Sequence, residues 1–198
     1  MSIRATQKAD SRQRIVEAAG YRLRENGAAG TGVVEVMADA GLTHGGFYAH
    51  FDSKESLLTA ALQEAMLSRG GWLAGLDDMP RKKRVKVLLE RYLNPQHRDN
   101  PRDGCPLPAV APDMVNRESA MQPVFAQELE TSIAAITRLL RPESGSSAAA
   151  RADAVAALSL CVGGLLLARA VGDDDLSVEI LNATRQAGER AFMEKKKP

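Results

Sequence analysis

The sequence has few cysteines, few aromatic side chains and no excess of charge of either sign. The two cysteines among its 198 residues, Cys105 and Cys161, lie far apart in the chain, so they form no disulfide framework and no paired metal-ligand spacing. Aromatic residues make up 4% of the chain, but the hydrophobic share of 44% is ample for a core. A net charge of +1 argues against a general nucleic-acid binder, which would need bulk positive charge.

Long hydrophobic runs are also missing. The longest apolar stretch without a charge lies between Asp153 and Arg169 and has 15 residues, whereas a helix needs about 20 to span a bilayer. The N-terminus lacks the apolar segment of a secretory signal. We therefore expect a cytoplasmic protein that makes no contact with a membrane and in which this stretch forms a buried helix.

The sequence shows few of the residue patterns expected of an enzyme. None of its three histidines, His44, His50 and His97, has a metal-ligand neighbour at a useful spacing. No Ser/His/Asp or Cys/His constellation is visible, and the only hint of one is that Cys105 and His97 are close in sequence. We therefore expect no enzyme activity, no metal and no cofactor. The alternative classes are an all-helical enzyme or redox protein and a plain scaffold that only dimerises.

The most informative stretch runs from Thr31 to Lys54. Within it, Val33 to Ala40 has apolar residues at helical spacing, and Gly41 follows at a position that suits the left-handed end of a helix. Thr43 then offers a cap for a second short helix, from His44 to Phe51. Two short helices joined by a tight glycine-containing turn predict a helix-turn-helix, whose second helix enters the major groove of DNA.

The second of these helices has an unusual composition. Gly45 and Gly46 each cost about 1 kcal/mol relative to alanine inside a helix, which a purely structural helix would rarely carry twice near its start. Small residues there allow the backbone to approach a base or a phosphate closely. Phe47 and Phe51 can turn inward while Tyr48 projects its polar tip, so the pattern indicates a DNA-reading element.

The run Gly41–Leu57, GLTHGGFYAHFDSKESL, resembles the DNA-binding signature of the tetracycline-repressor (TetR/AcrR) family. Upstream, Arg14–Ala19 and Asn26-Gly27 resemble the first helix of that family. The resemblance is close over the first third of the chain; beyond it, only length, helix order and short strings are similar. It implies an all-α fold: an N-terminal three-helix helix-turn-helix DNA-binding domain at 1–56 and a larger C-terminal helical effector-binding and dimerisation domain at 57–198.

The resemblance and the predicted geometry together suggest which residues contact double-stranded operator DNA. We expect four to line the groove (His44, Gly45, Gly46 and Tyr48), three to hold phosphates (Thr43, His50 and Lys54), and Thr31 to contact the DNA backbone from the preceding helix. As alternatives, Thr43 is only a cap and His50 only a packed or solvated residue. The basic residues of Arg4–Arg14 form either a phosphate-gripping arm or a solvated tail.

The family resemblance also implies a ligand-responsive regulator, a repressor that an unknown small-molecule effector releases from DNA. Six residues of the C-terminal region are our candidates for the effector pocket: Trp72, Tyr92, Cys105, Met114, Met121 and Phe125. Ordinary core packing is the simpler reading of methionines and aromatics at helical spacing. The alternative function is an electrophile- or redox-sensing repressor acting through Cys105, because Gly104–Leu107 resembles a string found in several branches of the family at a helix entry.

Periodicity and caps predict the remaining helices from about Asp10 to Asn26, Ser53 to Ser68, Arg81 to Leu93, Gln122 to Leu140, Ala148 to Val171 and Asp173 to Phe192. We expect Asp52 and Glu55 to form a capping box, and Trp72–Met79, Asn94–Asp113 and Arg141–Ser147 to be irregular. Arg81–Arg84 is interpreted as a solvated face rather than a phosphate patch.

The helix after Ser147 is apolar on several sides and must be covered on more sides than one small domain can cover. We therefore expect the last two helices to form a homodimer interface.

Overall fold

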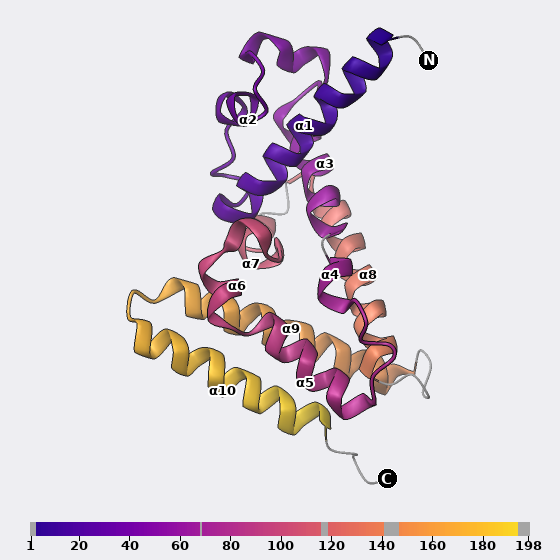
Figure 1. Cartoon of the computed structure of the whole chain (residues 1–198), viewed down its shortest axis with the longest axis vertical. Helices are drawn as coiled ribbons and strands as arrows, with labels where there is room; N and C mark the ends of the chain where they lie inside the picture. Colours follow the sequence, from indigo (N-terminus) through magenta and orange to yellow (C-terminus); the bar gives the residue numbers. More distant parts are fainter. Residues whose placement is uncertain (1–2, 68, 116–118, 141–146, 194–198) are drawn as a thin grey trace. The chain divides into compact units, whose positions relative to one another are not determined.

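A computed structural model describes residues 3–67, 69–115, 119–140 and 147–193. Within these ranges the regular structure is entirely helical, so the predicted all-α class is confirmed (Figure 1). The elements are α1 (Ile3–Asn26), α2 (Val33–Asp39), η1 (His44–Ala49), α3 (Lys54–Leu67), α4 (Arg69–Leu73), α5 (Arg81–Tyr92), α6 (Pro95–Asp99), η2 (Pro101–Asp103), α7 (Leu107–Val110), η3 (Asp113–Val115), α8 (Gln122–Leu140), α9 (Ala148–Ala170) and α10 (Asp174–Met193), where η denotes a 3-10 helix.

The chain packs as two compact units. The first comprises Met1–Ser68 and Pro101–Glu128, and the second comprises Arg69–Asn100 and Leu129–Pro198. The first unit therefore combines the predicted helix-turn-helix with a segment from the middle of the chain, which the sequence did not indicate. The functional boundary between residues 56 and 57 stays a prediction.

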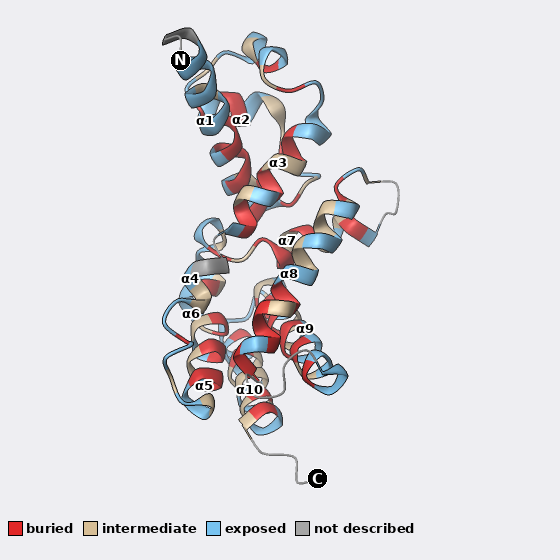
Figure 2. Ribbon diagram, turned by 90° about the vertical axis from the view of Figure 1, so that its right-hand side faces the viewer, coloured by how far each residue is buried: buried red, intermediate tan, exposed pale blue. Residues whose placement is uncertain are grey.

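In the first unit, α1 packs along α3. Ile15, Ala19 and Leu23 of α1 are completely buried, as are Ala61 and Leu62 of α3. Figure 2 shows the buried residues of α2 and α3 in red. The helical spacing of these apolar residues predicted this inward stripe, and burying it is the main stabilising contribution to the three-helix core.

Helix α1 begins earlier than expected. The predicted start near Asp10 is wrong, because the helix is already formed at Ile3 and runs for 24 residues. The preceding segment has no glycine or proline, and its Ala, Gln and Lys residues favour helix. The basic residues Lys8 and Arg12 are consequently carried on a helix rather than on a flexible arm.

The start of α3 is capped by serines. Ser56 N–H donates to the Ser53 hydroxyl at 3.1 Å, and Ser53 N–H lies 3.3 Å from the Ser56 hydroxyl. The reciprocal pattern is that of a capping box, one residue later than the predicted pair Asp52 and Glu55. A serine hydroxyl at the third helical position replaces the carboxylate that the pattern usually supplies.

In the second unit, α10 packs against both α9 and α5, and Figure 1 shows α9 and α10 side by side. The interpretation of Arg81–Arg84 as a solvated face is wrong for two of its four residues. Arg81 donates to the carbonyls of Leu140 and Phe192 at 2.6 and 2.7 Å. Arg84 is 8% exposed and donates to the Leu139 carbonyl at 3.0 Å. These guanidinium groups satisfy carbonyls at the ends of α8 and α10, where positive charge is favourable.

Two segments expected to be irregular contain short helices. Trp72 and Leu73 belong to α4, so the predicted loop from Trp72 to Met79 begins only after Leu73. The stretch from Asn94 to Asp113 contains α6, η2 and α7, and the Asn94 side chain caps α6 by accepting from His97 N–H at 2.9 Å. Of the linker predicted at Arg141–Ser147, residues 141–146 lie outside the described residues; the Ser147 hydroxyl caps α9 by accepting from Ala150 N–H.

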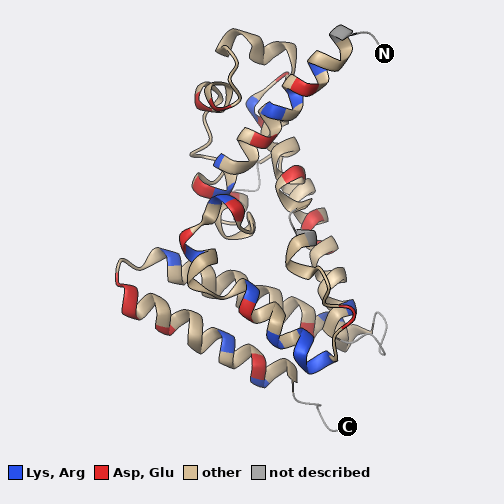
Figure 3. Cartoon of the chain, viewed as in Figure 1, with Lys and Arg blue, Asp and Glu red and all other residues tan. Residues whose placement is uncertain are grey.

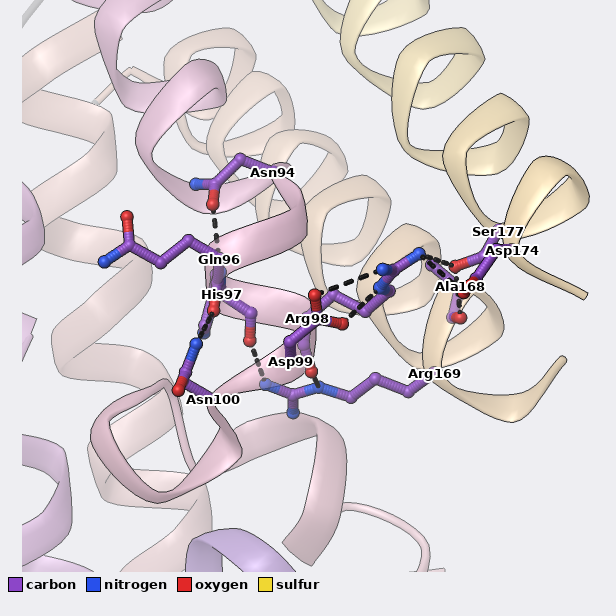
Figure 4. A network of polar contacts seen from close by, with 10 residues as sticks. All are labelled: Asn94, Gln96, His97, Arg98, Asp99, Asn100, Ala168, Arg169, Asp174 and Ser177. Atoms are coloured by element: carbon purple, nitrogen blue, oxygen red, sulfur yellow. Dashed lines mark hydrogen bonds and ion pairs between the residues drawn. The ribbon is translucent and has the colours of Figure 1, made fainter. Parts of the chain in front are cut away.

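A polar network joins α6 to the ends of α9 and α10 (Figure 4). Arg169 donates to the carbonyls of His97 and Arg98 at 2.6 and 3.1 Å. Arg98 in turn donates to the Ser177 hydroxyl at 2.8 Å, and Ser177 donates to the Ala168 carbonyl at 2.7 Å. Within the second unit, this network fixes the turn between the last two helices.

Candidate nucleic-acid interface

The turn after α2 has the geometry that the sequence predicted. Gly41 has φ of +66°, and its N–H donates to the Ala38 carbonyl at 2.9 Å. Leu42 N–H donates to the Met37 carbonyl at 2.9 Å, which completes a Schellman motif. The Arg14 guanidinium donates to the Ala40 carbonyl, so α1 holds the end of α2 from outside.

The second element of the motif is a six-residue 3-10 helix, η1, rather than the predicted helix from His44 to Phe51. Two of its first three residues are glycines, which contribute little to a regular α-helix. Thr43 occupies the N-cap position as predicted, but its side chain makes no capping hydrogen bond. Thr43 itself is exposed to solvent.

Two phenylalanines anchor η1 to the core. Phe47 and Phe51 are 2% and 4% exposed, and their rings stack with centroids 6.0 Å apart. Met37 of α2 is completely buried in the same core. The anchor fixes the outward face of η1 in position, as the inward orientation of the two phenylalanines predicted.

The outward face of η1 is open. Tyr48 is 73% exposed and His44 is also exposed. A Cβ atom built on Gly45 would meet nothing within 4 Å, and one on Gly46 would lie 3.7 Å from the Met37 methyl group. Neither glycine is therefore needed for packing inside the protein. Their lack of side chains leaves room for an external partner to approach the backbone.

Lys54 lies at the edge of this face. It is exposed and is the first residue of α3, a helix of 14 residues. The N-terminus of a helix carries partial positive charge and backbone N–H groups. The ammonium group and the helix terminus together suit a phosphate group.

His50 is electrostatically different from its neighbours. Its Nδ1 atom is buried without a hydrogen-bond partner among the described residues. Burial is the main cause that lowers the pKa of His50, and the nearby charges of Lys8 and Arg12 lower it further. His50 is therefore neutral at pH 7 and can meet a phosphate through an Nε2–H donor rather than as a cation.

Lys8 and Arg12 belong to the basic run Arg4–Arg14, for which the sequence left open a phosphate-gripping arm or a solvated tail. The Arg12 guanidinium lies 4.8 Å from the centre of the Phe51 ring, and both residues are close enough to His50 to influence its pKa. Because α1 continues through this run, both side chains are held on a helix beside the end of η1.

Thr31 does not fit the predicted contact. It is 1% exposed, and its hydroxyl donates to the Gly27 carbonyl at 2.7 Å. The side chain thus closes the loop after α1 and has no surface for DNA. We remove Thr31 from the proposed contact set because its hydroxyl already satisfies a buried carbonyl.

An ion pair holds α2 against α1. The Arg22 Nε donates to an Asp39 carboxylate oxygen at 2.6 Å. This hydrogen bond is the main cause that lowers the pKa of Asp39. Because both side chains are partly exposed, the pair orients α2 more than it stabilises the fold.

The predicted effector residues divide between the two units. Trp72 and Tyr92 lie in the second unit with ring centroids 5.5 Å apart. The sequence missed their third partner: the His97 ring lies 4.2 Å from Trp72 and 4.7 Å from Tyr92. His97 Nδ1 lies 2.7 Å from the Tyr92 carbonyl, and burial lowers its pKa to about 4, so the ring is neutral.

The other four candidates belong to the first unit: Cys105, Met114, Met121 and Phe125. Met114 and Met121 are 7% and 2% exposed, which agrees with ordinary core packing, while Cys105 and Phe125 are partly exposed.

Taken together, these features define a class of protein. A capped helix, a Schellman turn and a short exposed second element on an aromatic anchor form a helix-turn-helix, followed by a larger helical region. Residues 15–61 match the family model described as bacterial regulatory proteins, tetR family. This region of the chain therefore belongs to the TetR family of bacterial regulatory proteins.

Solved structures with this fold cover nearly the whole chain. A TetR-family regulator from Cytophaga hutchinsonii aligns with a TM-score of 0.77 and 18% identity, over 98% of this chain and 99% of that one. A TetR regulator from Chloroflexus aurantiacus gives 0.78 and 21%, over 96% and 98%. The reduced form of E. coli NemR gives 0.75 and 20%, over 91% and 96%. At these identities the similarity establishes the fold.

A curated relative matches part of the sequence. An uncharacterized HTH-type transcriptional regulator of Bacillus subtilis, YerO, is 26% identical over 90 residues. The match spans 46% of this chain and 31% of that relative's length. It supports the family assignment.

Proposed function

We propose that the protein is a repressor that binds double-stranded operator DNA as a homodimer and leaves it when a small-molecule effector binds. The open face of η1 carries this proposal: Tyr48 is 73% exposed, and no atom lies within 4 Å of a Cβ built on Gly45. Packing inside the protein does not explain two glycines beside an exposed tyrosine. Close approach of the backbone to bases and phosphates does explain them.

The contacts follow from the exposed residues. His44, Gly45, Gly46 and Tyr48 line the major groove, and Thr43, His50 and Lys54 hold phosphates, assisted by Lys8 and Arg12 from α1. Release by an effector requires that it bind better to a conformation in which the two DNA-binding heads no longer match successive grooves. The loss of DNA affinity then equals that difference in effector affinity.

The homodimer is proposed to form through α9 and α10. Among the described residues, one helix, Ala148–Ala170, is long and apolar enough to cross a membrane, with 39% of its most apolar window buried in the single chain. Such a helix is equally the core of a soluble protein. Val155, Leu166 and Leu167 of α9 are 39%, 38% and 58% exposed, so this helix offers an apolar surface to a second copy.

A gel-shift titration with the DNA upstream of the protein's own gene tests the proposal. The wild-type protein is expected to shift this fragment, and Tyr48→Ala is expected to weaken the shift by about tenfold or more. Val115→Ala is the control, because Val115 is 81% exposed and lies outside the helix-turn-helix. Equal shifts for wild type and Tyr48→Ala on this fragment would contradict the assignment of the reading face.

The second candidate function is a sensor acting through Cys105. The favouring observation is electrostatic: Cys105 is partly exposed, and it lies close enough to the buried Arg24 for a thiolate there to stabilise the Arg24 charge. The helix that follows, α7, has only four residues, so the helix dipole contributes little. The reduced state in which E. coli NemR was solved makes redox chemistry worth testing in this protein.

The test is alkylation by N-ethylmaleimide followed by the same gel shift. If Cys105 is the sensor, the reagent weakens DNA binding in the wild type but not in Cys105→Ser. Cys161→Ser is a matched control, because Cys161 is buried in α9. An identical response of wild type and Cys105→Ser would leave the small-molecule effector as the remaining mode of release.

A further inference from the structure

A small pocket that is open to solvent on one side lies between α1, α3 and η2 of the first unit. Its volume is about 230 Å³. This is below the usual 300–1,000 Å³ of ligand pockets, so it suits a molecule of a few heavy atoms. The lining residues are Glu17, Gly20, Tyr21, Arg24, Glu64, Arg102 and Asp103.

Gly20 keeps this cavity open. A Cβ built on Gly20 would lie 3.6 Å from the Ala61 carbonyl oxygen, 3.8 Å from Arg24 Nη1 and 4.0 Å from the Ala65 Cβ. These are ordinary van der Waals contacts, so packing does not require glycine at this position. Glycine weakens a helix interior relative to alanine. The chain thus retains a helix-weakening residue at a position of α1 where a larger side chain would fill the cavity.

A largely buried cation, Arg24, lines the cavity. Arg24 is 9% exposed, and its Nη2 donates to the Ala65 carbonyl at 3.1 Å. Its Nε has no hydrogen-bond partner among the described residues. Burial lowers the pKa of Arg24, but arginine remains charged in proteins. The Nε atom is fully enclosed, whereas Nη1 lies 3.8 Å from a Cβ built on Gly20, a residue of the pocket lining, so a ligand carboxylate would meet the guanidinium through Nη1.

The second guanidinium of the cavity is already engaged. Arg102 lies over the Tyr21 ring at 4.4 Å from its centre, and Arg102 Nη1 is 3.7 Å from a Glu25 carboxylate oxygen. Three carboxylates also line the cavity, on Glu17, Glu64 and Asp103. Basic and acidic residues both lie along α1 (Figure 3). The described lining of the cavity therefore offers an available cation opposite several anions, which matches a ligand carrying both signs of charge.

We propose that this cavity binds a small zwitterion, a free amino acid, with its carboxylate on Arg24 and its ammonium group facing Glu17 and Glu64. The site lies in the unit that holds η1 and is separate from Trp72 and Tyr92 of the second unit. Because α1 and α3 support the helix-turn-helix, an occupant also changes DNA affinity. The binding itself does not depend on the proposed repressor function.

Isothermal titration of the full-length protein with each standard amino acid in turn tests this inference. At least one small amino acid is expected to bind with one site per chain. Acetate and methylammonium each carry only one of the two charges and should bind roughly tenfold more weakly or not at all. The inference is overturned if no amino acid binds, or if acetate binds as tightly as the best amino acid.

Three variants locate the site. Gly20→Leu fills the cavity and should abolish binding, whereas Gly71→Leu, on an open glycine of α4, should leave it unchanged. Glu17→Gln removes one exposed carboxylate without disturbing the core and should weaken binding roughly tenfold, so the test survives if Gly20→Leu fails to fold. Unchanged binding in Glu17→Gln, or persistent binding in a folded Gly20→Leu, places the amino acid elsewhere and refutes the assignment.

A parallel titration of labelled operator DNA separates this inference from the proposed function. If the amino acid binds in the calorimeter but the protein shows no operator binding, the repressor proposal fails and the site stands. If the protein binds DNA but no amino acid, the site fails and the repressor proposal stands.

Discussion

Lys54 is the residue whose proposed role can be measured most directly. Its side chain is exposed at the first position of α3, beside the face formed by η1. A lysine that neutralises one phosphate displaces about one counterion, which sets its share of the salt dependence of DNA binding. A lysine that is only a solvated surface residue displaces none.

Lys54→Ala should therefore weaken binding to all DNA sequences about equally and reduce the slope of log K against log salt by about one. Fluorescence anisotropy at several salt concentrations measures this slope. Lys86→Ala is the matched control, since Lys86 is exposed on α5 and pairs with Glu90 at 3.8 Å. A slope that is the same in Lys54→Ala and Lys86→Ala would exclude a phosphate contact at Lys54.

His97 makes a prediction about pH. Burial lowers its pKa to about 4 in the folded protein, against about 6.5 in the unfolded chain. The unfolded chain thus binds more protons between these values, and the free energy of unfolding rises with pH across this range. The stabilisation is fully present above about pH 6.5 and is lost as the pH falls towards 4, to the extent of about 3 kcal/mol.

Urea unfolding of wild type and His97→Gln at several pH values between 4 and 7 checks this dependence. The wild type should lose stability steeply on acidification, and the variant should lose roughly 3 kcal/mol less over the same interval. The variant will be less stable at pH 7, because His97 packs against Trp72 and Tyr92. Parallel curves for the two proteins would show that His97 is not the group responsible.

At the scale of the element, two glycines with opposite roles lie four residues apart. Gly41 has φ of +66°, and a Cβ on it would lie 2.8 Å from the Arg14 guanidinium, so it is required by the backbone of the turn. Gly45 has open space in place of a side chain. Only Gly41 should therefore matter for the stability of the fold, and only Gly45 for the approach of DNA.

Gly41→Ala should lower the free energy of unfolding by about 1–2 kcal/mol, because an L-residue is strained in the left-handed region. Gly45→Ala should leave stability unchanged or slightly higher, yet weaken operator binding by about tenfold if the backbone approaches the groove. Chemical unfolding and anisotropy on both variants supply the comparison. Full operator affinity in Gly45→Ala would show that the backbone at this glycine does not approach the DNA closely.

At the scale of the whole molecule, the apolar surface of α9 predicts self-association. The described chain leaves Leu167 at 58% exposure on a helix whose most apolar window is only 39% buried. Two reading heads on one face of DNA must lie about 34–36 Å apart, or a multiple of it, which a two-fold dimer can provide.

Leu167→Glu should shift the protein from dimer to monomer at micromolar concentration and weaken operator binding accordingly, because a charge is costly in an apolar interface. Sedimentation equilibrium measures the change. Val115→Glu is the control, as an equally drastic substitution at an exposed apolar residue of the first unit. A wild-type protein that is monomeric at micromolar concentration would contradict the prediction outright.

The sequence by itself determined the helix-turn-helix and the family, because those features depend on local chemistry. Gly41 needs a left-handed backbone, Phe47 and Phe51 need burial at helical spacing, and the apolar stripe of α1 needs a partner; each requirement can be read from a few neighbouring residues. The end of α2, the anchor of η1 and most of the long helices followed from such rules.

Only the tertiary structure decided features that depend on residues distant in sequence. Thr31 was predicted to contact DNA, but its hydroxyl donates to the Gly27 carbonyl and closes a loop. Arg84 was predicted to be solvated, but it donates to a carbonyl at the end of α8. His97 joins Trp72 and Tyr92, and η2 joins α1 and α3 around Arg24, through contacts that no local pattern encodes. The physical reason is that burial and hydrogen-bond partners of a side chain are set by what folds against it, which local periodicity cannot specify.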